Sequence, residues 1–355
     1  MSTGILLLGC THPHSPLHLG TLRASDQVTG IRFWDPDVDA AESLAEQAGG
    51  KAVGVTADLR EALSGPEPFA LVCRTNDRTP ETALAAFAAG KHVLSEKPGA
   101  RSSAELVPVV EAARRARVGL GYCYPWRSHP AAIDLRGDVE RGRLGRLLAV
   151  EARLVTSQVR FRDPAHWLFT RELGGGGILH WLACHFIDLL RFILVDEVVR
   201  VTALTGTLNG FPLQVEDTAA LAVEWGSGAL GTFSAGYHLP RSVAGYSGAT
   251  YDNMLAARGL DGRFTWHPTR DKEIVRLESI HPEWAGAPER ERRYRLEPSP
   301  AYSGRHGLAF FHEFLARARA GTRQLASGED ALATLRIVEA AYRSAESGRV
   351  ESVMS

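Results

Sequence analysis

Residues 68–98, PFALVCRTNDRTPETALAAFAAGKHVLSEKP, hold the pattern that decides the fold. The apolar run at 68–76 is typical of a buried strand, and residues 80–90 have helical spacing between a proline and a glycine. Residues 91–98 form a second short apolar strand. Two strands joined by one helix predict a right-handed crossover and therefore a parallel sheet.

The same alternation extends to both sides of this segment. Further strands are predicted at 4–9, 30–37 and 118–124, with helices at 38–49 and 103–117. Ser102 and Glu105 have the spacing of a capping box, which marks the start of the second of these helices. We therefore predict an α/β fold that begins with a Rossmann-like, doubly wound parallel sheet over residues 1–121.

The remainder, residues 122–355, follows a different pattern. Strand-like stretches with few helices between them occur at 146–157, 198–206, 217–239 and 272–279. Their alternation and the Gly-Ser-Gly turn at 226–228 predict hairpins. Helices are predicted at 177–194, 306–320 and 328–347, and the last two are free to pack back on the first domain. We expect a second α/β domain with a large, mostly antiparallel open sheet.

Composition excludes several classes of protein. The 355 residues are 45% hydrophobic and 23% charged, and 40 basic side chains balance 41 acidic ones, so nucleic acid is not an expected partner. The apolar runs are shorter than the roughly 20 residues of a membrane span, and the first residues do not resemble a signal peptide. We expect a cytoplasmic protein without a membrane partner. Its 4 cysteines are scattered, which disfavours disulfides and a structural zinc site.

The turn after the first strand is the expected place for a dinucleotide, because a pyrophosphate binds there at a helix N-terminus. Gly9 alone remains of the G-x-G-x-x-G pattern, and Thr11 and His12 offer side-chain donors to phosphate instead. Asp35 ends the second strand, where a carboxylate accepts from ribose hydroxyls and repels a 2′-phosphate. The expected cofactor is therefore NAD rather than NADP, the alternative for Asp35 being a turn residue before Pro36.

Three histidines, His12, His14 and His18, also raise the question of a metal site. No carboxylate or thiolate pattern beside them in the sequence completes a ligand set, so we expect no metal and assign them to phosphate contact or to packing of the turn.

Glu96, Lys97 and Pro98 end the strand at 91–98 and lie at the carboxyl edge of the predicted sheet. A lysine there can donate a hydrogen bond to a substrate hydroxyl and stabilise an alkoxide. The alternative interpretation of Lys97 is a solvated surface lysine, but the flanking Glu96 and Pro98 disfavour it.

Residues 74–98 resemble the signature of the Gfo/Idh/MocA family of dehydrogenases, which includes glucose-fructose oxidoreductase and inositol dehydrogenase. Four further blocks agree in order and spacing, at 121–131, 141–152, 173–193 and 327–353. The resemblance implies NAD or NADP, hydride transfer at a secondary alcohol of a sugar or cyclitol, and a homodimer or homotetramer assembled through the open sheet.

Carried over by position, the resemblance makes Lys97 the catalytic lysine. It places Thr75, Asn76 and the Glu96-Lys97-Pro98 triplet at the cofactor, with Arg74 and Thr75 replacing a Thr-Pro pair. It also makes His185 the histidine that handles the substrate proton. The chain departs from the family at Trp181, where an acid is expected four residues before this histidine. Proton transfer is therefore expected to rest on Lys97 and His185. Asp188 either orients His185 or is an ion-paired structural residue.

Four residues are predicted to contact a sugar or polyol substrate: Tyr124, Arg127, Trp167 and Trp181. The leading function is an NAD(P)-dependent dehydrogenase or reductase acting on CH–OH groups. Two alternatives remain: a lyase that cleaves a glycosidic bond through transient oxidation, suggested by Trp181, and a non-catalytic cofactor-binding subunit, suggested by the incomplete glycine pattern.

Overall fold

The computed structural model describes residues 2–240, 250–268 and 273–353, and the chain divides into two compact units. The first unit comprises Met1–His129 and Leu296–Leu332, and the second comprises Pro130–Arg295 and Ala333–Ser355. The boundary that we predict after residue 121 remains a prediction: the compact units divide after His129, and a segment close to the C-terminus returns to the first unit.

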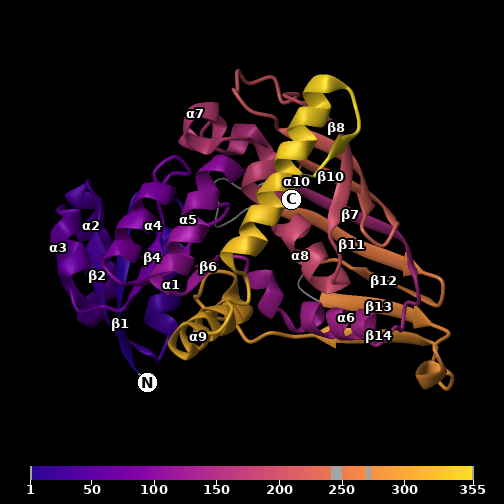
Figure 1. Ribbon diagram of the computed structural model, residues 1–355, viewed down its shortest axis with the longest axis horizontal. Helices are drawn as coiled ribbons and strands as arrows, with labels where there is room; N and C mark the ends of the chain where they lie inside the picture. Colours follow the sequence, from indigo (N-terminus) through magenta and orange to yellow (C-terminus); the bar gives the residue numbers. More distant parts are fainter. Residues whose placement is uncertain (1, 241–249, 269–272, 354–355) are drawn as a thin grey trace. The chain divides into compact units, whose positions relative to one another are not determined.

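Six parallel strands form the sheet of the first unit, in the order β3-β2-β1-β4-β5-β6 (Figure 1). The strands are β1 (Thr3–Leu8), β2 (Val28–Trp34), β3 (Ala52–Thr56), β4 (Phe69–Val72), β5 (His92–Ser95) and β6 (Leu120–Tyr122). The strand order reverses at β1 and β4, and ligands of doubly wound sheets bind beyond the carboxyl edge at such a reversal. The predicted doubly wound sheet is confirmed.

Helices accompany these strands, and three of them begin at a side-chain cap, which is Asp37, Asp58 or Ser102. The helices are α1 (Ser15–Ala24), α2 (Val38–Ala48), α3 (Leu59–Ser64), α4 (Thr79–Ala88), α5 (Ser103–Ala116) and α9 (Gly304–Ala320), with the 3-10 turns η1 (Gly49–Lys51) and η2 (Pro125–Ser128). The Ser102 side chain accepts from the Glu105 backbone N–H, as predicted. The Glu105 carboxylate accepts from the backbone N–H of Arg101.

The sequence pattern missed β3 and α3. The strand β3 is a half-buried edge strand of 5 residues, and α3 has 6 residues with an Asp58 cap, so neither is long enough to show a clear period. Pairing with β2 is what holds β3 in place.

Nine strands form the sheet of the second unit, in the order β14-β13-β12-β11-β7-β10-β9-β8-β15. Their bounds are β7 (Leu147–Ser157), β8 (Val198–Gly206), β9 (Thr218–Trp225), β10 (Leu230–Leu239), β11 (Tyr251–Gly259), β12 (Gly262–Trp266), β13 (Glu273–Ser279), β14 (Glu289–Tyr294) and β15 (Glu351–Ser352). Strands β7 and β10 pair in parallel, and the other described neighbours pair antiparallel. The mostly antiparallel sheet and the β9–β10 hairpin are therefore confirmed.

The helices of this unit include α6 (Pro130–Glu140), α7 (Arg171–Gly174) and α8 (Cys184–Leu194), and α10 (Gly328–Ser347) continues into it. The short turns are η3 (Val159–Phe161), η4 (Trp167–Phe169), η5 (Leu179–Ala183) and η6 (Pro282–Trp284). Figure 1 shows α6 and α8 beside the large sheet. The Ser344 hydroxyl in α10 accepts from the backbone N–H of Ala203 in β8, which ties this helix to the sheet.

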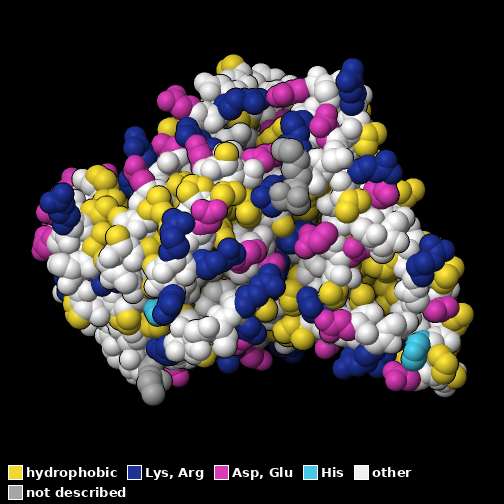
Figure 2. Space-filling view, viewed as in Figure 1, with side chains coloured by type: hydrophobic (Ala, Val, Ile, Leu, Met, Phe, Trp, Pro, Cys, Tyr) yellow, Lys and Arg dark blue, Asp and Glu magenta, His cyan; other side chains and the backbone are white. Residues whose placement is uncertain are grey.

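Among the residues that the structure describes, one segment, Arg171–Leu194, is long and apolar enough to cross a membrane, with a mean hydropathy of 1.5. Its most apolar window is 94% buried inside the protein, so the segment belongs to the core. The helix expected at 177–194 is confirmed from residue 178, and it contains the π-helical turn η5 before α8. Figure 2 shows acidic and basic side chains interspersed over the visible surface, as the near-neutral charge predicts.

A buried histidine pair makes the stability of the first unit depend on pH. Burial, and then His129, lower the pKa of His306 in α9 from 6.5 to about 3. The unfolded chain therefore binds a proton at this side chain near pH 6.5 while the folded chain does not. We expect stability to be full above pH 6.5 and to fall between pH 6.5 and 3, by about 2 kcal/mol at pH 5.

Urea unfolding at pH 7.5 and pH 5 measures this loss, and His306→Gln is the matched variant. The variant should lose less stability than the parent over the same interval. Equal losses in both proteins would show that His306 does not carry the effect.

Candidate active site

Lys97 follows β5 at the carboxyl edge of the first sheet and has no exposed surface. The preceding carboxylate, Glu96, is 2% exposed. Its Oε2 atom accepts from the backbone N–H of Lys97 at 3.1 Å. A buried ammonium group and a buried carboxylate thus occupy adjacent positions at the edge where ligands of such sheets bind.

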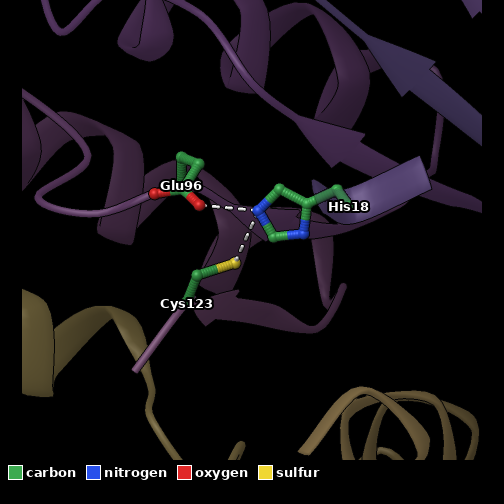
Figure 3. A group of neighbouring side chains, drawn as sticks. All are labelled: His18, Glu96 and Cys123. Carbon is green, nitrogen blue, oxygen red and sulfur yellow. Dashed lines mark hydrogen bonds and ion pairs between the residues drawn. The ribbon is translucent and has the colours of Figure 1, made fainter. Parts of the chain in front are cut away.

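Two histidines of the first turn and helix converge on the other oxygen of this carboxylate. Glu96 Oε1 lies 3.1 Å from His14 Nδ1 and 2.6 Å from His18 Nε2. Figure 3 shows that one ring nitrogen of His18 faces both Glu96 and Cys123, whose sulfur lies 3.9 Å from His18 Nε2. The ring of Tyr302, which precedes α9, packs 5.0 Å from His14 and 4.8 Å from His18.

His18, Glu96 and Cys123 have the side-chain types of a zinc site, with ligand atoms within 4.8 Å of one another. However, two ligands on one tetrahedral zinc lie roughly 3.3 Å apart, given zinc–ligand bonds of about 2.0–2.2 Å. The separation of 2.6 Å between His18 and Glu96 is shorter and is a hydrogen-bond distance. We therefore treat the group as a hydrogen-bonded cluster.

The charge states in this cluster follow from burial and from the hydrogen bonds. Burial opposes ionisation of Glu96, but His14 and His18 outweigh it and hold the pKa of Glu96 well below its usual value. Burial lowers the pKa of His14 and also that of His12, which keeps both rings neutral. The cluster is thus a carboxylate that accepts from two imidazoles.

Gly9, the first residue of the expected phosphate turn, has a φ of 111°, and a Cβ atom there would lie 2.0 Å from the Cys73 carbonyl oxygen. Only glycine fits this close approach of β1 to β4. The turn leads directly into α1, so its backbone has the shape and position that a dinucleotide requires. Gly9 and the N-terminus of α1 thus fit NAD.

Asp35 anchors this turn. Its side chain is buried, and its Oδ2 atom accepts from the backbone N–H groups of Cys10 at 2.6 Å and of Thr11 at 3.2 Å. Arg74 Nη1 lies 3.5 Å from the same oxygen, and its guanidinium group packs over the Trp34 ring. The role of Asp35 toward ribose stays a prediction, whereas its role in holding the loop is visible.

Replacing Asp35 with alanine should raise the dissociation constant for NAD about tenfold or more. The substitution removes the charge-assisted hydrogen bonds that hold the turn in its binding conformation, and each of these bonds contributes about 1.5–3 kcal/mol. Calorimetric titration with NAD measures the change. Asp37→Ala, which removes only an exposed cap of α2, should leave the affinity within about twofold. Unchanged affinity in the Asp35 variant would contradict the prediction.

The other residues predicted at the cofactor lie at the same edge of the sheet or beside it. The Thr75 carbonyl accepts from the Thr79 hydroxyl at the start of α4, and Asn76 is buried. The His12 ring accepts at Nδ1 from the backbone N–H of His14. Thr11 is exposed and its hydroxyl contacts Asp35. Contact of these residues with NAD, and that of Pro98, stays a prediction.

Two predicted substrate residues, Tyr124 and Arg127, belong to the first unit and are buried. Arg127 Nη1 donates to the Leu325 carbonyl at 2.8 Å and lies 3.3 Å from Asp330. These contacts give Arg127 a structural role, and a role toward substrate stays a prediction.

The glycine run of the second unit is held by a buried carboxylate. A Cβ atom on Gly177 would lie 1.8 Å from the Glu216 carbonyl oxygen, so the run must be glycine at this point. The Glu216 carboxylate accepts from the backbone N–H groups of Gly177 and Leu179, and from the Tyr342 hydroxyl at 3.0 Å. Sequence reasoning missed Glu216, because its partners lie far away along the chain.

The segment that follows carries the remaining predicted residues. Trp181 is 1% exposed and packs edge-to-face on Trp167, with ring centroids 5.8 Å apart. His185 is 8% exposed, and Asp188 Oδ1 lies 3.7 Å from Arg191 Nη1. Trp181 lies in the π-helical turn, so the four-residue spacing to His185 does not imply the shared face that we expect from an α-helix.

The fold and these clusters define a class of protein, a two-unit oxidoreductase with a Rossmann-type dinucleotide domain. Residues 4–123 match the model of an oxidoreductase family with an NAD-binding Rossmann fold, and residues 134–264 match a GFO/IDH/MocA C-terminal domain. The chain belongs to the GFO/IDH/MocA family. It is an NAD-binding enzyme, as the sequence predicts.

Several characterised relatives span the whole chain. The chain is 28% identical over 337 residues to a 1,5-anhydro-D-fructose reductase of Ensifer adhaerens, which covers 94% of each protein. It is 26% identical to a myo-inositol 2-dehydrogenase of Thermotoga maritima, over 98% of this chain and 97% of that one. The fold matches that of a levoglucosan dehydrogenase in complex with NADH and levoglucosan, with a TM-score of 0.86, 21% identity and full coverage of both chains.

Proposed function

We propose that this enzyme transfers hydride between NAD and a secondary alcohol or ketone of a sugar, cyclitol or related polyol. The observation that carries the proposal is Lys97, a lysine with no exposed surface that follows β5 at the edge where Gly9 forms the dinucleotide turn. The relatives named as a fructose-derivative reductase and an inositol dehydrogenase support the substrate class.

Bound NAD supplies the hydride acceptor, or NADH the donor. The chain supplies the proton chemistry: the Lys97 ammonium group donates a hydrogen bond to the substrate oxygen and stabilises negative charge on it. His185 assists in moving the proton, and Trp167, Trp181 and Tyr124 offer aromatic faces to the C–H groups of the ring. Trp181 has no titratable group, so Lys97 and His185 carry the proton chemistry by themselves.

A screen of sugars, cyclitols and their keto derivatives, followed by NADH absorbance with NAD and with NADP, tests the proposal. We expect stoichiometric NADH formation or consumption with at least one polyol. Turnover of a glycoside without net NADH would instead identify the lyase. If none of the compounds changed the absorbance although NAD bound tightly, the chain would be a non-catalytic cofactor-binding subunit.

We also propose a cytoplasmic homodimer or homotetramer assembled through the open sheet. Five outward-facing residues of β8, β9 and β10 are small or apolar and line a shallow groove: Leu204, Ala220, Ala222, Thr232 and Ser234. Leu204 is 77% exposed and lies beside Ala220 on the neighbouring strand. Light scattering should give a multiple of the 38.5 kDa chain mass, and Leu204→Arg should reduce it.

A further inference from the structure

The proposed function gives no role to His14 and His18, the last two histidines of the H-x-H-x3-H spacing in the first turn. His14 and His18 belong to the segment that enters and forms α1, yet both rings reach the residue before Lys97, across 82 and 78 positions of the chain. One carboxylate oxygen serves the two rings, and the other accepts from the Lys97 backbone.

Charge compensation is required in this cluster because the ammonium group of Lys97 has no exposed surface. A buried cation is costly unless a counter-charge and hydrogen bonds accompany it. Glu96 raises the pKa of three neighbouring groups, and Lys97 lowers the pKa of the same three: His12, His14 and Cys123. Glu96 is therefore the carboxylate that shares the surroundings of Lys97.

Both imidazoles donate to this carboxylate and thereby favour its ionised form. His14 donates from Nδ1 and His18 from Nε2, because an ionised carboxylate only accepts hydrogen bonds. The Tyr302 ring packs on both and holds their orientation. The resulting arrangement holds a buried anion, Glu96, directly before the buried Lys97, with one carboxylate oxygen on the Lys97 backbone.

We propose that His14 and His18 are positioning residues that act through Glu96: they fix the backbone of Lys97 and keep its ammonium group protonated, so that Lys97 presents a proton to the substrate oxygen. This inference rests on the proposed function, in which Lys97 contacts that oxygen. It adds two positioning residues behind Lys97 and assigns the resting charge state of the lysine.

Other titratable groups also surround the cluster. They come from the turn before α1, from the ends of β4 and β6, and from the segment before α9: His12, Cys73, Tyr122, Cys123 and Tyr302. Burial raises the pKa of both thiols and of Tyr122, and it lowers that of His12, so these four groups stay neutral. We therefore expect the protonation of Lys97 to depend on Glu96 and on the hydrogen bonds that His14 and His18 make to this carboxylate.

The test is the pH profile of kcat/KM for ketone reduction, with NADH and a polyol-derived ketone found in the screen. Glu96→Gln removes the negative charge and keeps the side-chain shape, so it should move the alkaline limb to lower pH by at least about one unit. His18→Phe should move the limb in the same direction. His18→Gln, which restores an N–H donor, should return it toward the parent position.

Three further measurements separate a positioning role from a structural one. NAD affinity and the unfolding midpoint should stay close to parent values in Glu96→Gln and His18→Gln. His281→Gln, at a half-buried turn of the second unit, is the matched control and should leave the profile unchanged. If His18→Phe does not fold, the isosteric Glu96→Gln variant decides the question.

The inference would be overturned if Glu96→Gln and His18→Phe lowered kcat but left the alkaline limb of the pH profile at the parent position. The proposed function would then remain intact. Full turnover by a Lys97 variant would instead reject the role of the lysine in the proposed function. The two failures are therefore distinguishable.

Discussion

Replacing Lys97 with alanine is expected to lower kcat by about three orders of magnitude while the variant folds and binds NAD within about threefold of the parent. Loss of a group that donates a proton or stabilises an oxyanion typically costs a factor of about 10²–10⁴. Steady-state kinetics and calorimetric titration with NAD measure the two quantities separately.

Lys97→Met is the companion variant, because the lysine is fully buried and alanine would leave a cavity. Methionine is one heavy atom shorter than lysine, so it fills most of the space and removes the charge and the donors. Both variants should lose turnover equally. If Lys97→Met were as active as the parent enzyme, the lysine would be a packing residue and the proposed mechanism would be wrong.

Replacing Glu216 with alanine is expected to destabilise the protein by about 4 kcal/mol, which lowers Tm by roughly 5 °C. The substitution leaves the backbone N–H groups of Gly177 and Leu179, and the Tyr342 hydroxyl, without the acceptor that they bind in the parent. Each buried group that loses its partner costs about 1–3 kcal/mol. Thermal unfolding with and without NAD measures the loss.

Glu216→Gln and Tyr342→Phe are the graded controls. Glutamine retains one acceptor oxygen, and phenylalanine removes a single hydrogen bond, so each should cost about 1–2 kcal/mol. The order of stability should be parent, then the two controls, then Glu216→Ala. If Glu216→Ala unfolded at the same temperature as the parent, the carboxylate would not hold the glycine run.

Several features of this protein follow from its sequence alone. The apolar runs and helical spacing of residues 68–98 determine a strand–helix–strand unit, and the structure contains it as β4, α4 and β5. The close approach of β1 and β4 explains why the first turn keeps Gly9 although the rest of the glycine pattern is absent. The short β3 and α3 were missed, since few residues carry their pattern.

Only the tertiary structure brings together the groups on which the proton chemistry depends. His14 and His18 suggest a phosphate contact in the sequence, but folding brings them to Glu96. Glu216 is likewise joined to Gly177 by the pairing of distant segments. Local periodicity predicts which face of an element is buried, because burial repeats along the chain. The partner of a buried polar side chain has no such repeat, since it depends on which distant segments meet in the folded protein.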